Sequence, residues 1–213
     1  IEAVRQLIYE RGENNAMTIH LTLIPFLSAA GELKTKPTQH SVKTLMESGI
    51  KADVLVCRTE HVLSDDLRKK LALFCNVKYE AVIQSIDVET IYDVPLKMQD
   101  EGLDRVVIKK LKLKPRQSAD LKQWQEFLNK YKNPKSKVKI GLVGKYVELQ
   151  DSYKSILESF IHAGALNEVE VEIITIHSES LLNKNQISKL KYLDGIVVAP
   201  GFGERGIEGK IKA

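Results

Sequence analysis

Apolar side chains in the first half of the chain recur with the period of a strand at three places. Residues 17–23 place them at every second position, and shorter buried strands are expected at 53–57 and 81–85. Segments of helical period separate these strands and continue after the last one, with breaks at Pro95 and Gly102. Strands that alternate with helices predict an α/β fold with a parallel sheet.

Two of the predicted helices have clear ends. Thr38 can cap one that ends at Gly49, and Ser64, followed by two aspartates, is a strong start for another. The second helix is expected to bury one stripe of apolar side chains, namely Leu67, Leu71 and Phe74.

The second half of the chain repeats this alternation as a fresh unit. Strands are expected at 138–143, 170–176 and 194–199, with helices at 152–165 and 185–192. Residues 115–136 differ, because they combine prolines and lysines with a single helix. Ser118 is expected to cap this helix, and Trp124 is expected to pack it against the rest of the protein. We therefore predict an interdomain connector, followed by a second sheet rather than a continuation of the first.

Composition and charge narrow the class of protein. With 213 residues and 43% hydrophobic residues, the chain can form a packed core, and no apolar run approaches the roughly 18 residues of a membrane span. The two cysteines, Cys57 and Cys75, sit among apolar neighbours, which favours a reducing compartment over a disulfide scaffold. A net charge of +4 is weak for a nucleic-acid binder but suits a small polyanion such as a nucleoside triphosphate.

The first segment with candidate chemistry is Gly31-Glu-Leu-Lys-Thr-Lys-Pro-Thr-Gln-His-Ser41. Two lysines, two threonines and the free N–H groups of a helix N-terminus form a plausible phosphate cradle. The alternative is a hydrated surface loop whose lysines keep it in water, and composition alone favours that alternative.

The second segment contains Gly201, Gly203 and Gly206, which match the G-x-G-x-x-G spacing and follow a strand. A dinucleotide-dependent oxidoreductase is therefore one hypothesis, although the fingerprint normally follows the first strand of its domain. The other is a tightly turned backbone whose N–H groups face a developing oxyanion. Glycine spacing alone does not choose between them.

These two segments and four further blocks resemble the CTP synthase family. The further blocks are His20-Leu-Thr-Leu-Ile-Pro25, Leu73-Phe-Cys-Asn-Val77, Gly141-Leu-Val-Gly-Lys-Tyr146 and Asp151-Ser-Tyr-Lys-Ser155. The resemblance implies the end of a P-loop-like amidoligase (synthetase) domain at 1–114 and a linker at 115–136. At 137–213 it implies the opening half of a class I glutamine amidotransferase domain with a flavodoxin-like fold.

The resemblance also implies an activity, the ATP-dependent amination of UTP to CTP with ammonia from glutamine hydrolysis. It implies Mg²⁺ and ATP as cofactors, GTP as an activator, and a cytoplasmic homotetramer without nucleic-acid or membrane partners. The chain opens inside a helical pattern and closes just after a glycine-rich loop. We therefore expect a fragment that is inactive alone, with the ATP phosphate loop, the metal ligands and the nucleophilic cysteine outside it. Besides a CTP synthase fragment and the dinucleotide-dependent oxidoreductase, a third hypothesis is a regulatory protein that keeps the triphosphate site but has no catalytic activity.

The family's binding residues carry over by position. Those that contact UTP and CTP correspond to Lys34, Thr35, Lys36, Pro37, Thr38, Gln39 and Lys70. Backbone groups of Ile86, Asp87 and Val88 would contact ATP, and Gly201 would bind glutamine and help form the oxyanion hole. Because Pro200 has no N–H, any donor role there falls on Gly201 or a later amide. No catalytic residue and no metal ligand is expected within the chain.

Overall fold

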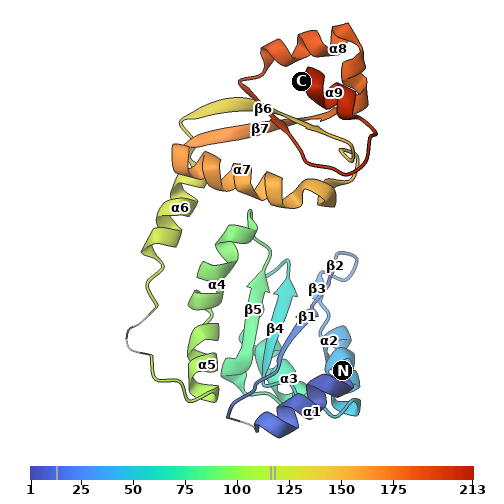
Figure 1. Ribbon diagram of the computed structural model, residues 1–213. Helices are drawn as coiled ribbons and strands as arrows, with labels where there is room; N and C mark the ends of the chain where they lie inside the picture. Colours follow the sequence, from blue (N-terminus) through green and yellow to red (C-terminus); the bar gives the residue numbers. More distant parts are fainter. Residues whose placement is uncertain (13, 116, 118) are drawn as a thin grey trace. The chain divides into compact units, whose positions relative to one another are not determined.

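The computed structural model describes residues 1–12, 14–115, 117 and 119–213, and they form two compact units, Ile1–Ala119 and Asp120–Ala213. Within the described residues, each unit has its own three-stranded parallel sheet (Figure 1). The prediction of an α/β fold with two separate parallel sheets is therefore confirmed.

The sheet of the first unit has the strand order β1-β4-β5, and its strands are β1 (Ile19–Leu23), β4 (Val54–Thr59) and β5 (Val82–Ile86). Helices α2 (Lys36–Glu47) and α3 (Asp65–Cys75) cover one face, where Leu55 and Leu71 are fully buried. Helices α4 (Val94–Asp100) and α5 (Leu103–Lys110) cover the other face over Val54 and Ile83 (Figure 1). Because all three strands are parallel, their carboxyl ends meet at one edge.

Helix α3 begins where the sequence predicts. The Ser64 side chain accepts a hydrogen bond from the Leu67 N–H at 3.3 Å. The expected buried stripe is wrong at Phe74, which is 59% exposed, because the face turned to the sheet carries Leu71 and Cys75, four residues apart. Phe74 lies between these two residues in the sequence, but its side chain points away from the sheet, toward the solvent.

The segment between β1 and α2 is more ordered than a loop. β2 (Phe26–Leu27) and β3 (Glu32–Leu33) form an antiparallel hairpin that the sequence analysis did not predict. The predicted cap at Thr38 is also wrong, because α2 already begins at Lys36 and has Pro37 in its first turn. Proline has a fixed φ that suits the first turn of a helix, which explains the earlier start.

An ion pair between α3 and the turn after α4 ties the first unit together. The Arg68 guanidinium binds both carboxylate oxygens of Glu101, at 2.7 and 3.0 Å, and the Gln84 N–H of β5 donates to the same carboxylate at 3.0 Å. Burial by itself would raise the pKa of Glu101, but the hydrogen bonds from Arg68 and Gln84 and the Arg68 charge outweigh it and lower that pKa.

The sheet of the second unit has the order β7-β6-β8, with β6 (Ser136–Gly144) between β7 (Val169–His177) and β8 (Gly195–Val198). The strand ends lie within two residues of the predicted ones. Helix α7 (Lys154–Asn167) covers one face, and α8 (Lys184–Lys189) and α9 (Ile207–Lys212) lie on the other (Figure 1).

Two helices precede the sheets. Helix α1 (Glu2–Arg11) begins the first unit, and α6 (Lys122–Lys132) begins the second. The predicted cap of α6, Ser118, lies outside the described residues. The Phe127 ring of α6 packs edge-on to His162 of α7 at 5.8 Å, so α6 belongs to the second unit. In the described ranges, no helix combines the length and apolar character that crossing a bilayer requires.

Candidate functional site

In the first unit, two lysines predicted to bind phosphates act on one carboxylate. Lys34 forms an ion pair with Glu32 of the β2–β3 hairpin, and the hydrogen bond from Lys34 lowers the pKa of Glu32. The charge of Lys70, on α3, lowers the same pKa further. The amines of Lys34 and Lys70 therefore create a positive field in one region, next to the first turn of α2.

The polar side chains in the first turn of α2 fix that turn to the sheet. Thr38 is fully buried; its hydroxyl donates to the Leu23 carbonyl at 3.2 Å and lies 2.9 Å from the Thr22 hydroxyl of β1. The Gln39 amide donates to the Thr35 hydroxyl at 3.2 Å. These hydroxyls are bound within the protein, so the contribution that Thr35 and Thr38 offer a ligand is that of the backbone.

The remaining groups at this helix start are free to meet a ligand. Lys36 and Pro37 are exposed, and the N–H groups of the first turn have no acceptor within the helix. Together with Lys34 and Lys70, they make the start of α2 a positively polarised surface that can bind an anion.

The residues predicted to contact ATP lie at the carboxyl end of β5. Asp87 is already paired on both its backbone and its side chain: its N–H donates to the Thr59 carbonyl at 3.0 Å, and its carboxylate accepts from Arg58 Nε at 3.0 Å. Ile86 is the last residue of β5, and Val88 follows in the connection to α4. In this conformation the N–H and the carboxylate of Asp87 are engaged within the protein, so a contact of Asp87 to adenine would fall on its backbone carbonyl.

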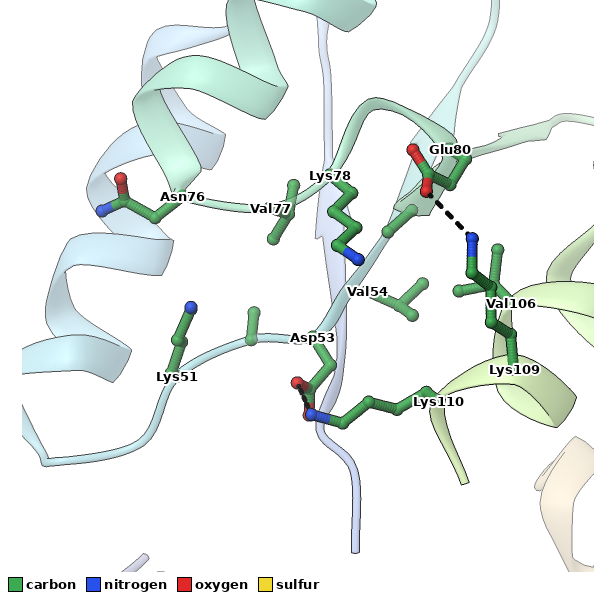
Figure 2. A pocket seen from close by; sticks show the side chains of 12 residues that line it. Lys51, Asp53, Val54, Asn76, Val77, Lys78, Glu80, Val106, Lys109 and Lys110 are labelled. Atoms are coloured by element: carbon green, nitrogen blue, oxygen red, sulfur yellow. Dashed lines mark ion pairs between the residues drawn. The ribbon is translucent and has the colours of Figure 1, made fainter. Parts of the chain in front are cut away.

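A cavity of about 390 Å³ opens at the opposite, amino ends of β4 and β5 (Figure 2). Two of its lysines pair with carboxylates, Lys110 with Asp53 at 2.7 Å and Lys109 with Glu80 at 3.7 Å. Its described lining includes none of the residues predicted to bind a nucleotide, and ligands of parallel α/β sheets bind at the carboxyl ends of the strands.

In the second unit, the carboxyl ends of three strands converge on the glycine loop. The chain runs from the central strand β6 to β7 on one side and then crosses to β8 on the other, and open α/β sheets bind ligands at such a switch point. Lys145 follows β6, His177 ends β7, and the loop with Gly201 follows β8. Gly201 therefore lies where the topology predicts a site.

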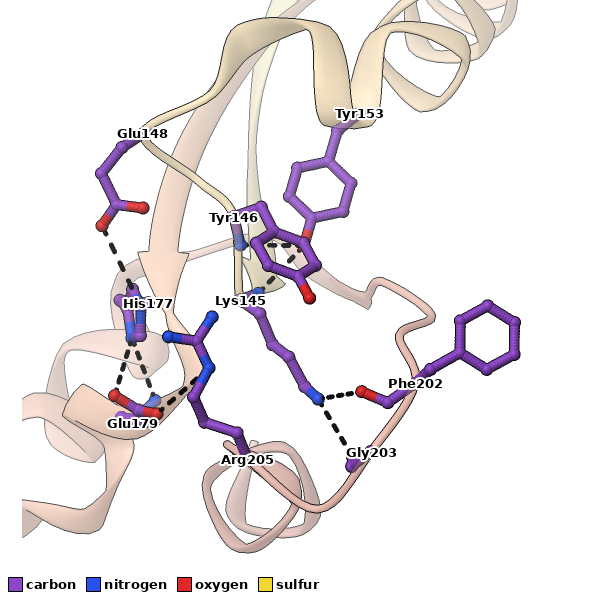
Figure 3. A network of polar contacts seen from close by, with 9 residues as sticks. All are labelled: Lys145, Tyr146, Glu148, Tyr153, His177, Glu179, Phe202, Gly203 and Arg205. Atoms are coloured by element: carbon purple, nitrogen blue, oxygen red, sulfur yellow. Dashed lines mark hydrogen bonds and ion pairs between the residues drawn. The ribbon is translucent and has the colours of Figure 1, made fainter.

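Two lysines bind the carbonyls of this loop. Lys145 is only 3% exposed, and its ammonium donates to the Phe202 carbonyl at 2.5 Å and to the Gly203 carbonyl at 3.0 Å (Figure 3). The Lys210 ammonium, from α9, donates to the Ala199 carbonyl at 2.7 Å. Lys145 was not among the residues predicted from the sequence to belong to a site; its place directly after a buried strand was the available signal.

An exposed network connects the far end of the loop to the neighbouring strand ends (Figure 3). Arg205 lies 3.7 Å from the Glu179 carboxylate and over the Tyr146 ring, 5.6 Å from its centroid. The His177 ring lies between Glu179 at 3.9 Å and Glu148 at 4.0 Å. The connections after β6, β7 and β8 thus meet in one polar surface at the carboxyl edge of the sheet.

The described residues contain no cluster of three or more His, Cys, Asp or Glu side chains that could hold a metal ion. Cys57 and Cys75 are both buried, and burial, followed by the nearby Cys75, raises the pKa of Cys57 to about 12. Both thiols belong to the core of the first unit.

Comparison with known proteins identifies both units. A family model described as "CTP synthase N-terminus" matches residues 1–113, and one described as "Glutamine amidotransferase class-I" matches residues 148–213.

Curated relatives match along the whole chain. The CTP synthase of Flavobacterium psychrophilum is 73% identical over 212 residues, that of Christiangramia forsetii 70% over 213, and that of Ruminiclostridium cellulolyticum 54% over 213. Each alignment covers 100% of this chain, which spans about 40% of the length of these relatives. The chain belongs to the CTP synthase family, with an N-terminal CTP synthase unit followed by the start of a class I glutamine amidotransferase unit.

Proposed function

We propose that the complete protein carrying this chain converts UTP to CTP, using ATP and ammonia released from glutamine. Relatives at 73% and 70% identity bear the name CTP synthase, and the two family models fall one on each unit. The uracil 4-oxygen is a poor leaving group, so ATP first phosphorylates it, and ammonia then displaces phosphate from the ring carbon. GTP as an activator and a homotetramer follow from the same family resemblance.

The observation that carries the proposal is the start of α2, where Lys34 pairs with Glu32, Lys36 is exposed and the first-turn N–H groups are free of helix acceptors. A triphosphate carries several negative charges, and hydrogen bonds to charged oxygens contribute roughly 1.5–3 kcal/mol each. Lys34, Lys36 and Lys70 would neutralise the UTP phosphates, while the turn at Thr35 and Thr38 would offer backbone N–H groups and Pro37, which has none, would fix the start of the helix. The Gln39 amide would exchange its hydrogen bond to the Thr35 hydroxyl for a directional hydrogen bond to the nucleotide.

ATP would lie at the carboxyl end of β5, next to Ile86, Asp87 and Val88. Mg²⁺ accompanies ATP in such reactions, but the described residues do not offer a set of carboxylates that fits the ion, and Asp87 is engaged with Arg58. We assign no step of the reaction to the metal within this chain.

The second unit would bind glutamine at Gly201 and stabilise the oxyanion formed during its hydrolysis. The buried Cys57, with its raised pKa, is unsuited to act as the nucleophile, because the thiolate is the reactive form. We infer that another part of the complete protein supplies the nucleophilic cysteine. The domain limits at 114 and 137 remain part of this proposal.

The first test is the substitution Lys36→Ala. Loss of one ammonium at the phosphates is expected to raise the apparent KM for UTP by at least about tenfold, equivalent to about 1.4 kcal/mol. CTP formation should be measured in the complete protein against UTP concentration, with ammonium chloride as the nitrogen source so that glutamine hydrolysis plays no part.

Lys43→Ala is the matched control, because Lys43 is exposed on the same helix and lies outside the predicted site. An unchanged UTP dependence for Lys36→Ala would contradict the assigned phosphate site. UTP binding without any CTP formation would instead favour the regulatory protein, and saturable NAD(H) binding would favour the oxidoreductase.

A further inference from the structure

Lys145 is a buried cation whose contacts are unusual for its type. Lysine is almost never fully buried unless it is paired, and an ammonium removed from water costs several kcal/mol without compensation. In the described part of the chain, the Lys145 Nζ donates hydrogen bonds to the carbonyls of Phe202 and Gly203. Because these contacts compensate for the burial of the charge, both carbonyls are held toward Lys145.

The direction of these carbonyls fixes the direction of two N–H groups. In a trans peptide the N–H of the following residue points away from the C=O, and the described residues contain no cis peptide bond. With the Phe202 and Gly203 carbonyls on Lys145, the N–H groups of Gly203 and Glu204 must point to the opposite side of the loop. Both residues are exposed, so that side faces the solvent.

Gly203 makes this arrangement possible through its backbone. Its φ of +74° lies in the left-handed region that other residues rarely adopt, and left-handed residues occur in the concave turns that direct consecutive N–H groups at an anion. A Cβ at Gly203 would meet nothing within 4 Å, so glycine is required there by conformation and not by space.

The Lys145 side chain supports the loop along its length. A Cβ at Gly201 would lie 3.6 Å from Lys145 Cε, and one at Gly206 would lie 3.6 Å from Lys145 Cγ. The loop therefore runs close to Lys145 from Gly201 to Gly206, while the Lys210 ammonium and the Ser178 hydroxyl lie nearer still to Gly201 and Gly206, respectively.

We propose that Lys145 is a positioning residue for glutamine hydrolysis, which aims the Gly203 and Glu204 N–H groups at the oxyanion of the substrate. The inference rests on the proposed function of the second unit. When the thiolate adds to the side-chain carbonyl of glutamine, a C–S bond forms, and the carbonyl π electrons move to the oxygen. Donors already aimed at that oxygen stabilise its charge without reorganisation, and losing one such donor typically lowers kcat by about 10²–10³.

Lys210 provides a matched control within the same loop. It also donates to a loop carbonyl, that of Ala199, but the next residue is Pro200, which has no N–H to aim. Removing either ammonium loosens the loop, whereas only the removal of Lys145 misdirects donors.

The test compares Lys145→Met with Lys210→Met in the complete protein, measuring glutamine-dependent and ammonia-dependent CTP formation. Lys145→Met is expected to lower kcat with glutamine by about 10² or more, with the glutamine KM within about threefold and the ammonia-dependent rate within about twofold. Lys210→Met should lower kcat by less than about fivefold. Lys145→Arg, which keeps the cation, should restore part of the lost kcat.

Three results would overturn the inference. An unchanged kcat for Lys145→Met would remove the positioning role, and a raised KM with unchanged kcat would mean that the N–H groups bind the substrate carboxylate instead. Equal losses in Lys145→Met and Lys210→Met would show that the loop needs only anchoring. If Lys145→Met does not fold, Lys145→Gln, which has a shorter and uncharged donor, takes its place. It is expected to lower kcat with glutamine while the glutamine KM and the ammonia-dependent rate stay within the limits given for Lys145→Met. Absence of glutamine-dependent activity in the unaltered protein would contradict the proposed function itself.

Discussion

Replacing Glu101 with glutamine is expected to lower the free energy of unfolding of the first unit by about 3 kcal/mol. The Arg68 and Glu101 side chains are 18% and 20% exposed, and the carboxylate joins α3, β5 and the turn after α4. A neutral amide leaves the Arg68 guanidinium without its counter-charge, and breaking a buried pair from one side costs about 3–5 kcal/mol. We expect the lower end, because a fifth of each side chain still contacts water.

The measurement is urea unfolding of the chain, monitored by hydrogen exchange of the β5 amide groups. Lys69→Ala is the control, since Lys69 neighbours Arg68 on α3 but forms only an exposed pair with Asp66 at 3.9 Å. That variant should change stability by less than about 0.5 kcal/mol. Similar effects of the two substitutions on the free energy of unfolding would show that the Arg68–Glu101 pair stabilises the first unit no more than an exposed ion pair does.

The same variant should alter the dependence of stability on pH. The folded protein holds the pKa of Glu101 below its ordinary value, so the unfolded chain binds its proton first as the pH falls. The contribution of the pair is therefore complete well above about pH 4.3 and is lost as the pH decreases through the lowered pKa of the folded state. With Glu101→Gln, the unfolding free energy should fall less steeply on the acid side.

Periodicity predicted the sheets well because it reports on local burial. The strands expected at 138–143 and 170–176 are both strands of the second sheet. Periodicity does not say which face is covered: in β1, the apolar Leu21 is exposed and Thr22 is buried against Thr38. The cover of a strand depends on its neighbours in space, which a single segment does not encode.

In the candidate sites, too, local features could be predicted from the sequence, whereas contacts between distant segments could not. The lysines at 34 and 36 stood out because their spacing beside Pro37 is a local feature, and the family resemblance added Lys70 from a separate helix. Glu32, the carboxylate on which Lys34 and Lys70 both act, was not predicted, because its role depends on a hairpin that the pattern did not reveal. Lys145 escaped notice for a different reason: lysine is a surface residue by default, and only the fold shows its amine under the loop.

A second large effect is expected at Gly209 in α9. Alanine is normally about 1 kcal/mol better than glycine inside a helix, so Gly209→Ala would stabilise a helix that stood alone. Here the Cβ would lie 1.7 Å from the backbone carbonyl oxygen of Ser178, which belongs to a short 3₁₀ helix, Ser178–Leu182. Leu181 in that helix is fully buried, so the carbonyl cannot retreat without disturbing the core over Val143.

We therefore expect Gly209→Ala to destabilise the second unit by about 3 kcal/mol, at the upper end of over-packing costs. Trp124 is the only tryptophan of the chain and lies in the second unit, so its fluorescence during urea unfolding reports on that unit. Glu208→Ala, at an exposed position of the same helix, should change stability by less than about 0.5 kcal/mol. A stabilising Gly209→Ala would mean that α9 does not pack against the Ser178 backbone. The hydrogen bond from Lys210 of α9 to the glycine loop would then also be contradicted.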